Sequence, residues 1–423
     1  MFQKLVQIFK VKEIRDKIIF ILVLLVIFRL AANIPVPGID QEKLKLFFGS
    51  NQFFGLLNLF SGGGLSQISI VMLGVGPYIN ASIIMQLLTM ISPRLNQIYK
   101  EEGEAGRQKF NQWTRWLTVP LAVVQTIGMI ALFRSQQIMT SHNILQMVTI
   151  IIVATAGSMF LTWLGEIITE KNIGNGVSLI IFAGIVAGLP SAASRLMATY
   201  DPSQLFTYIL LLVIILAAVA AIVFMTEGQR NIPIAYAKRI RGNRMYGGTS
   251  AHLPLRINQA GVIPIIFAMS IMLFPGMISS FLSQAGNPTV ANVARLIGNV
   301  FQNQWFYGIF YFILVVAFTY FYTAVVFDPN SISENLQRQG GYIPGIRPGK
   351  TTSEYLYQIM NRVTLTGAVF LGVIAILPFI VQGATNIGSV SIGGTGLLIV
   401  VAVVIEIVKQ LEGQLAMRSY EGF

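Results

Sequence analysis

Ten apolar stretches follow one another along this chain of 423 residues, and they leave few options for its fold. Their approximate positions are 18–32, 75–91, 117–133, 144–164, 176–189, 205–225, 261–282, 305–327, 363–381 and 390–408. A bilayer core about 30 Å thick needs about 20 mostly apolar residues per helix, and each stretch reaches or approaches that length. The sequence therefore predicts an all-α polytopic membrane protein with ten transmembrane helices.

The composition agrees with this prediction. Charged residues make up 11% of the chain, whereas a soluble domain carries about 25%. The net charge of +12 could indicate nucleic acid binding in a soluble protein, but in a membrane protein it more often reflects basic cytoplasmic loops. The chain contains no cysteine, which excludes disulfide and thiol chemistry.

The lysine and arginine residues predict an orientation. If the N-terminus is cytoplasmic, 23 of the 29 basic residues lie on the cytoplasmic side, 5 lie outside, and Arg29 lies within the first stretch. This asymmetry favours cytoplasmic N- and C-termini and an even number of helices. No small-residue cleavage site closes the first stretch, so we expect a retained helix rather than a signal peptide.

We expect two halves of five helices each, at 1–195 and 196–423. Because five is odd, the halves would have opposite topology, which is compatible with an inverted repeat although no sequence repeat is visible. Two long basic loops, at about 228–260 and 328–362, lie on the expected cytoplasmic side. They could only set the topology, but loops of this length often carry function.

The connection between the first two stretches is unusual. A glycine run at 62–64 precedes a short apolar piece that ends near 73 and cannot span a bilayer. Backbone that does not span is tolerated at membrane depth only where it is buried in protein or lines a cavity. The segment at about 60–73 is therefore either an outer loop or a re-entrant element inside a pore.

Several kinds of chemistry are excluded. The histidines His142 and His252 and all four aspartates lie in loops or at helix ends, so we expect no metal site, no cofactor and no catalytic pair in the membrane. No ionisable residue lies near the middle of a stretch, which argues against an ion-coupled transporter. The chain has no GxxxxGK[ST] phosphate-binding motif, so any energy must come from a separate motor.

Apolar side chains remain as candidates. Val75 and Ile79 are four residues apart, as are Val177 and Ile181, and Val262 and Ile266, so that each pair shares one helix face. Ile399 lies in the last stretch. Spacing alone indicates only lipid contact or core packing for these residues.

Six stretches resemble the SecY/Sec61 translocon family, especially its bacterial branch. They occur in family order at 76–84, 174–184, 252–255, 260–264, 344–349 and 393–399. The resemblance implies a channel in the bacterial plasma membrane, with ten helices in two pseudo-symmetric halves around an hourglass pore. Unfolded secretory polypeptides would cross the channel, and membrane proteins would leave it sideways into lipid. It implies no enzymatic activity.

The resemblance also assigns residues to the pore and the plug. The ring at the waist corresponds to Val75, Ile79, Val177, Ile181, Ile266 and Ile399, with Val262 as a weaker candidate. Such an apolar constriction gates by dewetting and offers a passing chain no fixed hydrogen-bond partner. The plug at about 60–73 includes Gly62, Gly63, Gly64, Leu65, Ile68, Ile70 and Val71.

The lateral gate and the partners follow from the same resemblance. The gate residues are Asn80, Gln125, Ser270 and Phe274, although each could instead serve ordinary helix packing. Docking residues on the basic loops are Arg239, Arg241, Arg244, Arg347 and Lys350. The implied partners are SecE, SecG, the SecA motor ATPase, the ribosome through its rRNA phosphates, signal-sequence-bearing polypeptides and the lipid bilayer.

Three alternatives stay open. A secondary transporter of a small solute would need charged or unwound polar groups at the membrane midplane. An intramembrane enzyme would need a catalytic pair at depth. A passive insertase would lack a through-pore, and the plug-like segment argues against it only weakly.

Overall fold

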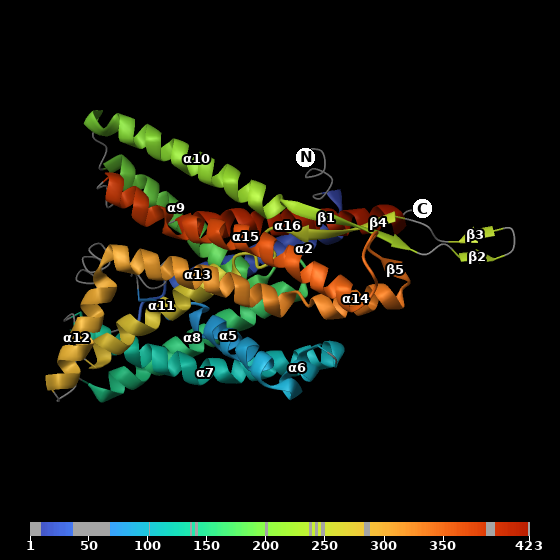
Figure 1. Cartoon of the computed structure of the whole chain (residues 1–423). Helices are drawn as coiled ribbons and strands as arrows, with labels where there is room; N and C mark the ends of the chain where they lie inside the picture. Colours follow the sequence, from blue (N-terminus) through green and yellow to red (C-terminus); the bar gives the residue numbers. More distant parts are fainter. Residues whose placement is uncertain are drawn as a thin grey trace.

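The structure is a computed structural model that describes residues 10–36, 68–100, 102–135, 138–139, 143–198, 202–236, 239–241, 244–246, 250–282, 288–385 and 394–421 (Figure 1). The candidate plug residues Gly62, Gly63, Gly64 and Leu65 lie outside these ranges. Most of the described chain is helical, and the long helices run roughly along one direction. The predicted all-α class is confirmed.

The helices follow the predicted stretches. In the first part of the chain they are α2 (Lys12–Ala32), α5 (Gly76–Ile91), α6 (Pro93–Lys100), α7 (Gly103–Ser135), α8 (Ile144–Glu170) and α9 (Gly176–Ala198). The second part contains the 3-10 helix η1 (Pro202–Gln204), followed by α10 (Leu205–Glu227), α11 (Ile263–Leu282), α12 (Pro288–Gln302), α13 (Gln304–Val326), α14 (Pro329–Arg338), α15 (Lys350–Thr385) and α16 (Gly394–Glu421). Each of the ten predicted stretches overlaps one of these helices. The expected division after residue 195 falls inside α9, which ends at Ala198.

The exposure of apolar side chains identifies lipid as the surrounding solvent. By length and composition, five helical segments of the described chain can cross a bilayer, and three shorter apolar helices accompany them. In the segment that contains α10, only 11% of the most apolar window is buried. Phe206 and Phe224 of α10 are 77% and 73% exposed. A water-soluble protein rarely exposes such a continuous apolar surface.

The loop predicted at 328–362 contains regular secondary structure that was not predicted from the sequence. It contains α14, the short strand β5 (Gly341–Tyr342) and the start of α15, which is 36 residues long. The Asp328 carboxylate caps α14 by accepting from the Asn330 and Ser331 amides at 3.1 and 3.4 Å. Hydropathy marks where a helix enters lipid, but a helix can continue into water with polar residues.

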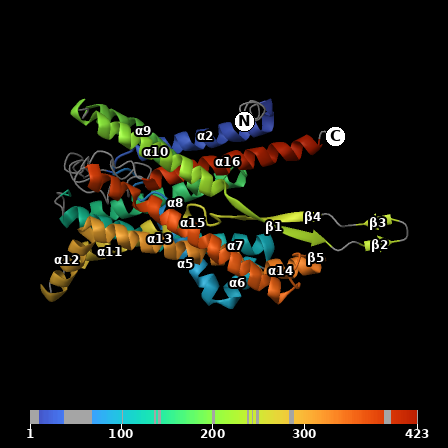
Figure 2. The same cartoon turned by 45° about the horizontal axis from the view of Figure 1, so that its top comes forward.

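The loop predicted at 228–260 contains strands that the sequence analysis missed. Strand β1 (Gln229–Tyr236) pairs antiparallel with β4 (Ser250–Arg256) and with β5, in the order β4–β1–β5. Ile232 and Ile234 alternate with exposed residues and are buried, which is the period-two signal that could have predicted β1. Strands β2 (Arg239–Arg241) and β3 (Arg244–Tyr246) form a hairpin that extends away from the helices (Figures 1 and 2).

Several buried threonine hydroxyls in the helices are satisfied locally. The hydroxyls of Thr118, Thr126 and Thr319 each donate to the carbonyl four residues earlier, at 2.7 to 2.8 Å. This bonding lets threonine lie inside a membrane bundle, where no water is available. Charged groups pair between helices near the ends of the bundle: Arg115 with Glu166 at 3.0 Å, and Lys409 with Glu227 at 2.9 Å.

Candidate functional site

The start of α5 carries the first two residues of the expected ring. Val75 is the N-cap of α5 and is 0% exposed, and Ile79 is 7% exposed one turn later. The Ile79 amide donates to the Val75 carbonyl at 3.0 Å, which sets both residues on one side of the helix start. Pro77 in the first turn suits this position because its missing N–H would have no helical partner there.

The start of α9 carries the next two residues. Ile181 is 1% exposed, and Val177 is half-buried. Gly176 lets α9 approach α8 closely, since a Cβ at this position would lie 1.8 Å from the Gly165 carbonyl oxygen. Only glycine fits this contact, which therefore sets the position of Val177 relative to α8.

The six candidate ring residues come from four helices, and all lie in or against the main apolar cluster. Ile266 of α11 and Ile399 of α16 are 5% and 1% exposed. Five of the six, all except Val177, belong to the main buried cluster, and Val177 packs against it. Val262 belongs to the same cluster, which also includes residues of α2, α8, α13 and α15, so the ring is one part of the core.

The segment that precedes α5 is a series of tight turns. Ser69 forms a bridge with Pro35, and the Val36 amide donates to the Ile68 carbonyl at 2.8 Å. Ile68 has a positive φ of 41°, an uncommon conformation for a β-branched residue. Ile68 and Val71 are 1% and 0% exposed, and Ile70 is half-buried. The described part of the expected plug is therefore packed into protein.

Gly157 of α8 lies close to the backbone of this segment. A Cβ added to Gly157 would lie 2.0 Å from the Ile70 carbonyl oxygen and 3.3 Å from the Val71 Cα. Because both neighbours are backbone atoms, a side chain at this position would displace the segment. The sequence analysis did not identify Gly157, since a glycine inside a membrane helix gives no signal about its contact.

The candidate gate residues lie on helices that contact one another. Asn80 of α5, Gln125 of α7 and Ser270 of α11 are buried, and Phe274 of α11 is half-buried. Each pair among α5, α7 and α11 is in contact. In the described part of the chain, the buried Asn80 Nδ2 has no hydrogen-bond partner.

The β2–β3 hairpin carries three of the candidate docking arginines. Arg241 pairs with Arg244 in the register of the two strands, and Arg239 pairs with Tyr246. The hairpin projects beyond the β1–β4 strands, as far from the helices as any labelled element (Figures 1 and 2). This placement gives the arginine backbone positions a prominent location at one end of the molecule.

The second docking segment, 343–350, is held rigidly at its base. Ile343 is 3% exposed and belongs to a small apolar cluster with Leu255 and Leu356. The Thr352 hydroxyl donates to the Arg347 carbonyl at 2.9 Å, and Ser333 donates to the Gly349 carbonyl at 2.7 Å. The side chains of Arg347 and Lys350 are exposed. A rigid base with exposed cations suits the recognition of a partner.

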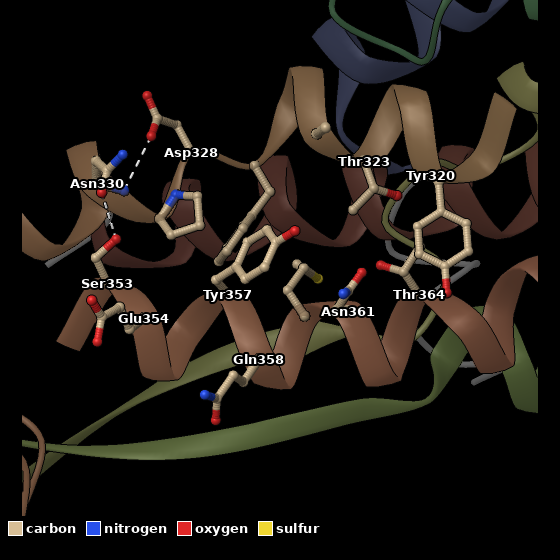
Figure 3. Close-up of a pocket in the computed structure, with 14 residues that line it drawn as sticks. Tyr320, Thr323, Asp328, Asn330, Ser353, Glu354, Tyr357, Gln358, Asn361 and Thr364 are labelled. Carbon is tan, nitrogen blue, oxygen red and sulfur yellow. Dashed lines mark hydrogen bonds between the residues drawn. The ribbon is translucent and has the colours of Figure 1, made fainter. Parts of the chain in front are cut away.

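A cavity of about 960 Å³ lies where α13, α14 and α15 meet, away from the ring residues (Figure 3). Its polar groups serve the joint between these helices: Asp328 caps α14, and the Ser353 hydroxyl donates to Asn330 Oδ1 at 2.6 Å. Among the described residues, no three His, Cys, Asp or Glu side chains are grouped to hold a metal ion. Neither observation indicates catalytic chemistry.

The loop between α8 and α9 makes hydrogen bonds with α16 and so links the first and second parts of the chain. The Gln414 Nε2 donates to the Asn172 carbonyl at 2.7 Å, and Gln410 Oε1 accepts from the Gly174 amide. Asn172 and Gly174 both have positive φ, at 58° and 84°. This contact between the α8–α9 loop and α16 was also missed, because more than 230 residues separate the partners.

The comparisons with known proteins agree with this arrangement. The sequence model of the SecY family matches residues 69–408. The protein translocase subunit SecY of Thermotoga maritima is 44% identical over 434 residues, which cover 100% of this chain and 98% of that protein. The chain belongs to the SecY family. The SecY proteins of Halalkalibacterium halodurans and Corynebacterium glutamicum are 43% and 41% identical, each over at least 99% of both chains.

Solved structures support the SecY fold. A protein-conducting channel superposes with a TM-score of 0.63 and 20% identity, covering 92% of this chain and 90% of that one. Sec61 in a canine ribosome–channel complex from the endoplasmic reticulum gives a TM-score of 0.61 and 19% identity, covering 93% and 90%. At these identities the comparison establishes the fold that the SecY-family chain shares with the two structures.

Proposed function

We propose that this SecY-family chain forms a protein-conducting channel that moves unfolded polypeptides across the bacterial plasma membrane and releases membrane proteins sideways into lipid. The observation that carries the proposal is that the six candidate ring positions, on α5, α9, α11 and α16, all lie in or against the main apolar cluster, where α5 contacts α11 and α9 contacts α16. A secondary transporter would need polar groups at such a site. An apolar ring instead excludes water and ions and offers a passing chain no fixed binding partner.

The closed state of the proposed gate between α5, α7 and α11 is only weakly stabilised. Asn80 is buried at this contact, and its Nδ2 has no hydrogen-bond partner among the described residues; leaving such a group unsatisfied costs about 1–3 kcal/mol. An opening that exposes Asn80 to a polar partner recovers part of that cost. A hydrophobic signal sequence that inserts between the helices could therefore shift the equilibrium toward the open gate.

The proposed plug is the segment at about 60–73. Support comes from its described end, where the 68–74 turns are buried between the Pro35 backbone and Gly157 of α8. Turns without a regular helix can be displaced as a unit more easily than a spanning helix. The glycines at 62–64 would provide the hinge for this movement.

In this proposal, the energy for transport comes from separate partner proteins that dock on the channel. Arg239, Arg241, Arg244, Arg347 and Lys350 form the docking surface for the SecA motor or the ribosome, with a salt-sensitive contribution wherever the partner is rRNA phosphate. SecE and SecG complete the complex. The chain has ten spanning helices in two halves that divide near residue 195, and both termini are cytoplasmic.

A crosslinking experiment tests the channel and the ring together. A photoreactive residue replaces Ile79 in vesicles that contain the chain, SecE, SecG and SecA, and a secretory precursor is stalled in transit with ATP. We expect an adduct between position 79 and the mature part of the precursor. The matched control places the same residue at Ile152, which is 62% exposed on the lipid-facing side of α8, and should give no precursor adduct.

The outcomes separate the two parts of the proposal. Transport without an adduct at position 79 would keep the channel and reject the ring. A folded complex that binds its partners but transports no precursor would reject the channel itself.

A further inference from the structure

The amphipathic helix α12 lies crosswise at the end of the bundle opposite the β1–β4 strands (Figures 1 and 2). It connects α11 to α13 and contains 15 residues, so it is about 22 Å long and too short to span a bilayer. In the sequence, this region lies between the predicted stretches 261–282 and 305–327. The helix and its contacts are therefore features that only the structure reveals.

One side of α12 is docked on α11 through small residues. Ala291 and Ala294 are 8% and 1% exposed, and the Ser279 hydroxyl of α11 donates to the Ala294 carbonyl at 2.7 Å. A Cβ at Gly298 would lie 2.5 Å from the Ser279 Oγ, so the two helices approach closely here. This face fixes the rotation of α12 about its axis.

A second face of α12 is apolar and exposed. Five large apolar residues, spaced mostly three or four positions apart, lie on this face, and each is at least 37% exposed. They are Val290 (37% exposed), Val293 (52%), Leu296 (65%), Ile297 (41%) and Val300 (46%). Asn292, Arg295 and Asn299 are also exposed and make up the polar face. Moving these side chains from water to an apolar environment is favourable, so water is a poor solvent for this surface.

The exposed apolar face of α12 continues onto the lipid-facing side of α13. Phe301 at the end of α12 contacts Phe306 and Phe310 of α13, with ring centroids 5.4 and 5.7 Å apart. Phe306 and Ile309 are 40% and 60% exposed. Trp305, at the start of α13, is 73% exposed, and tryptophan is enriched where a spanning helix meets the membrane–water interface.

We infer that α12 is an interfacial helix whose apolar face, made of Val290, Val293, Leu296, Ile297 and Val300, is embedded among the lipid acyl chains of the adjacent leaflet. Its polar face, with Asn292, Arg295 and Asn299, meets the headgroups and water. Lipid is the occupant because this face joins the lipid-facing side of α13, and because an amphipathic helix at the end of a bundle binds in the interface plane. The inference depends on the membrane location of the chain, not on transport.

Helix α12 is attached to α11, which carries the candidate gate residues Ser270 and Phe274. The Ser279–Ala294 hydrogen bond and the close contact at Gly298 couple α12 to the same helix. If α11 moves when the proposed gate opens, α12 must therefore move with it within the lipid leaflet. Lipid composition would then change the opening equilibrium through α12.

Spin labelling tests the inference directly, since the chain contains no cysteine. Single cysteines replace Val293, Leu296, Asn292 or Asn299, all of which are exposed, and each is labelled with a nitroxide. The variants are reconstituted with SecE and SecG into vesicles of phosphatidylethanolamine and phosphatidylglycerol. Collision rates with oxygen, which partitions into lipid, and with a water-soluble nickel chelate are then compared by power saturation.

We expect the oxygen-to-nickel ratio to be several-fold higher at positions 293 and 296 than at 292 and 299. A label at Ile309, which is 60% exposed on α13, provides the lipid reference. Equal ratios at all four positions would overturn the inference, because α12 would then lie in water. Low collision rates with both reagents at 293 and 296 would also overturn it, because a protein partner would then cover this face. None of these readouts depends on transport activity.

Discussion

Individual side chains at the candidate ring are both tightly packed and free of polar atoms. Ile79, Ile181 and Ile399 are at most 7% exposed, so they are packed like core residues. They also carry no polar atom, so no hydrogen bond must break when they separate. A seal of this kind can be tight at rest and still yield to a bulky polypeptide, because its cohesion is non-directional.

Replacing the four ring isoleucines by serine, at positions 79, 181, 266 and 399, should wet the constriction. We expect a steady ion current through planar bilayers that the unchanged protein lacks, because hydroxyl groups stabilise water in a narrow pore. The control replaces four lipid-exposed isoleucines by serine and should not conduct. These are Ile152 (62% exposed), Ile209 (52%), Ile309 (60%) and Ile313 (54%). Equal conductance in both variants would remove the isoleucines from the constriction.

Among the elements, the contact between α8 and the 68–74 turns shows how a membrane protein positions irregular backbone. Turns leave backbone groups without helical partners, and lipid cannot supply them. Here the Ile70 amide donates to the Ile34 carbonyl at 3.0 Å, and Gly74 donates to Val71 at 2.8 Å. Because Gly157 of α8 has no side chain, the turns can approach α8 closely.

Gly157→Ala should therefore destabilise the protein, although alanine is normally the better helix former by about 1 kcal/mol. The added methyl group would meet the Ile70 carbonyl at 2.0 Å, and overpacking of this kind costs about 1–3 kcal/mol. We expect a lower melting temperature in detergent and faster proteolysis of the 60–73 segment. Gly308→Ala in α13 is the matched control, since its new Cβ would have no neighbour within 4 Å. If both variants melt alike, the close contact at Gly157 is not present in the protein.

The whole molecule has two chemically different ends. One end carries the strands, the β2–β3 hairpin and the exposed cations Arg347 and Lys350, and the other carries α12 (Figures 1 and 2). The Lys409–Glu227 pair and the contact of Gln410 and Gln414 with the α8–α9 loop connect α16 to α10 and to the first part of the chain. Basic residues favour the cytoplasmic side, so the hairpin end should face the cytoplasm.

The orientation can be measured with single cysteines in right-side-out and inverted membrane vesicles. A cysteine at Glu334, exposed on α14, should react with a membrane-impermeant maleimide only in inverted vesicles. A cysteine at Asn299, on the polar face of α12, should react only in right-side-out vesicles. Lysed vesicles, in which both positions should react, provide the control. The reverse pattern would invert the proposed topology, and labelling of both positions from one side would contradict the end-to-end arrangement of the fold.

The sequence was sufficient for the class of fold, the approximate helix positions and the family. These depend on hydropathy and on local motifs, since a chain in lipid must satisfy its backbone within each helix. The candidate ring residues were found through the family resemblance. Their spacing alone indicated only packing, because Val75 and Ile79 look like any lipid-facing pair. The segment at about 60–73 was predicted not to span the bilayer, but neither the turns at its described end nor their partners were predicted.

Tertiary structure was needed wherever a role depends on a distant partner. Gly157 matters because of the Ile70 backbone, and Gln414 because of Asn172, which precedes it by 242 residues. The exposed apolar face of α12 is distinguishable from a buried one only after Ala294 and Gly298 are seen against Ser279. Local sequence reports how a segment interacts with its own backbone and with its solvent. Which two surfaces touch is a property of the folded chain, because packing joins residues that local patterns treat as independent.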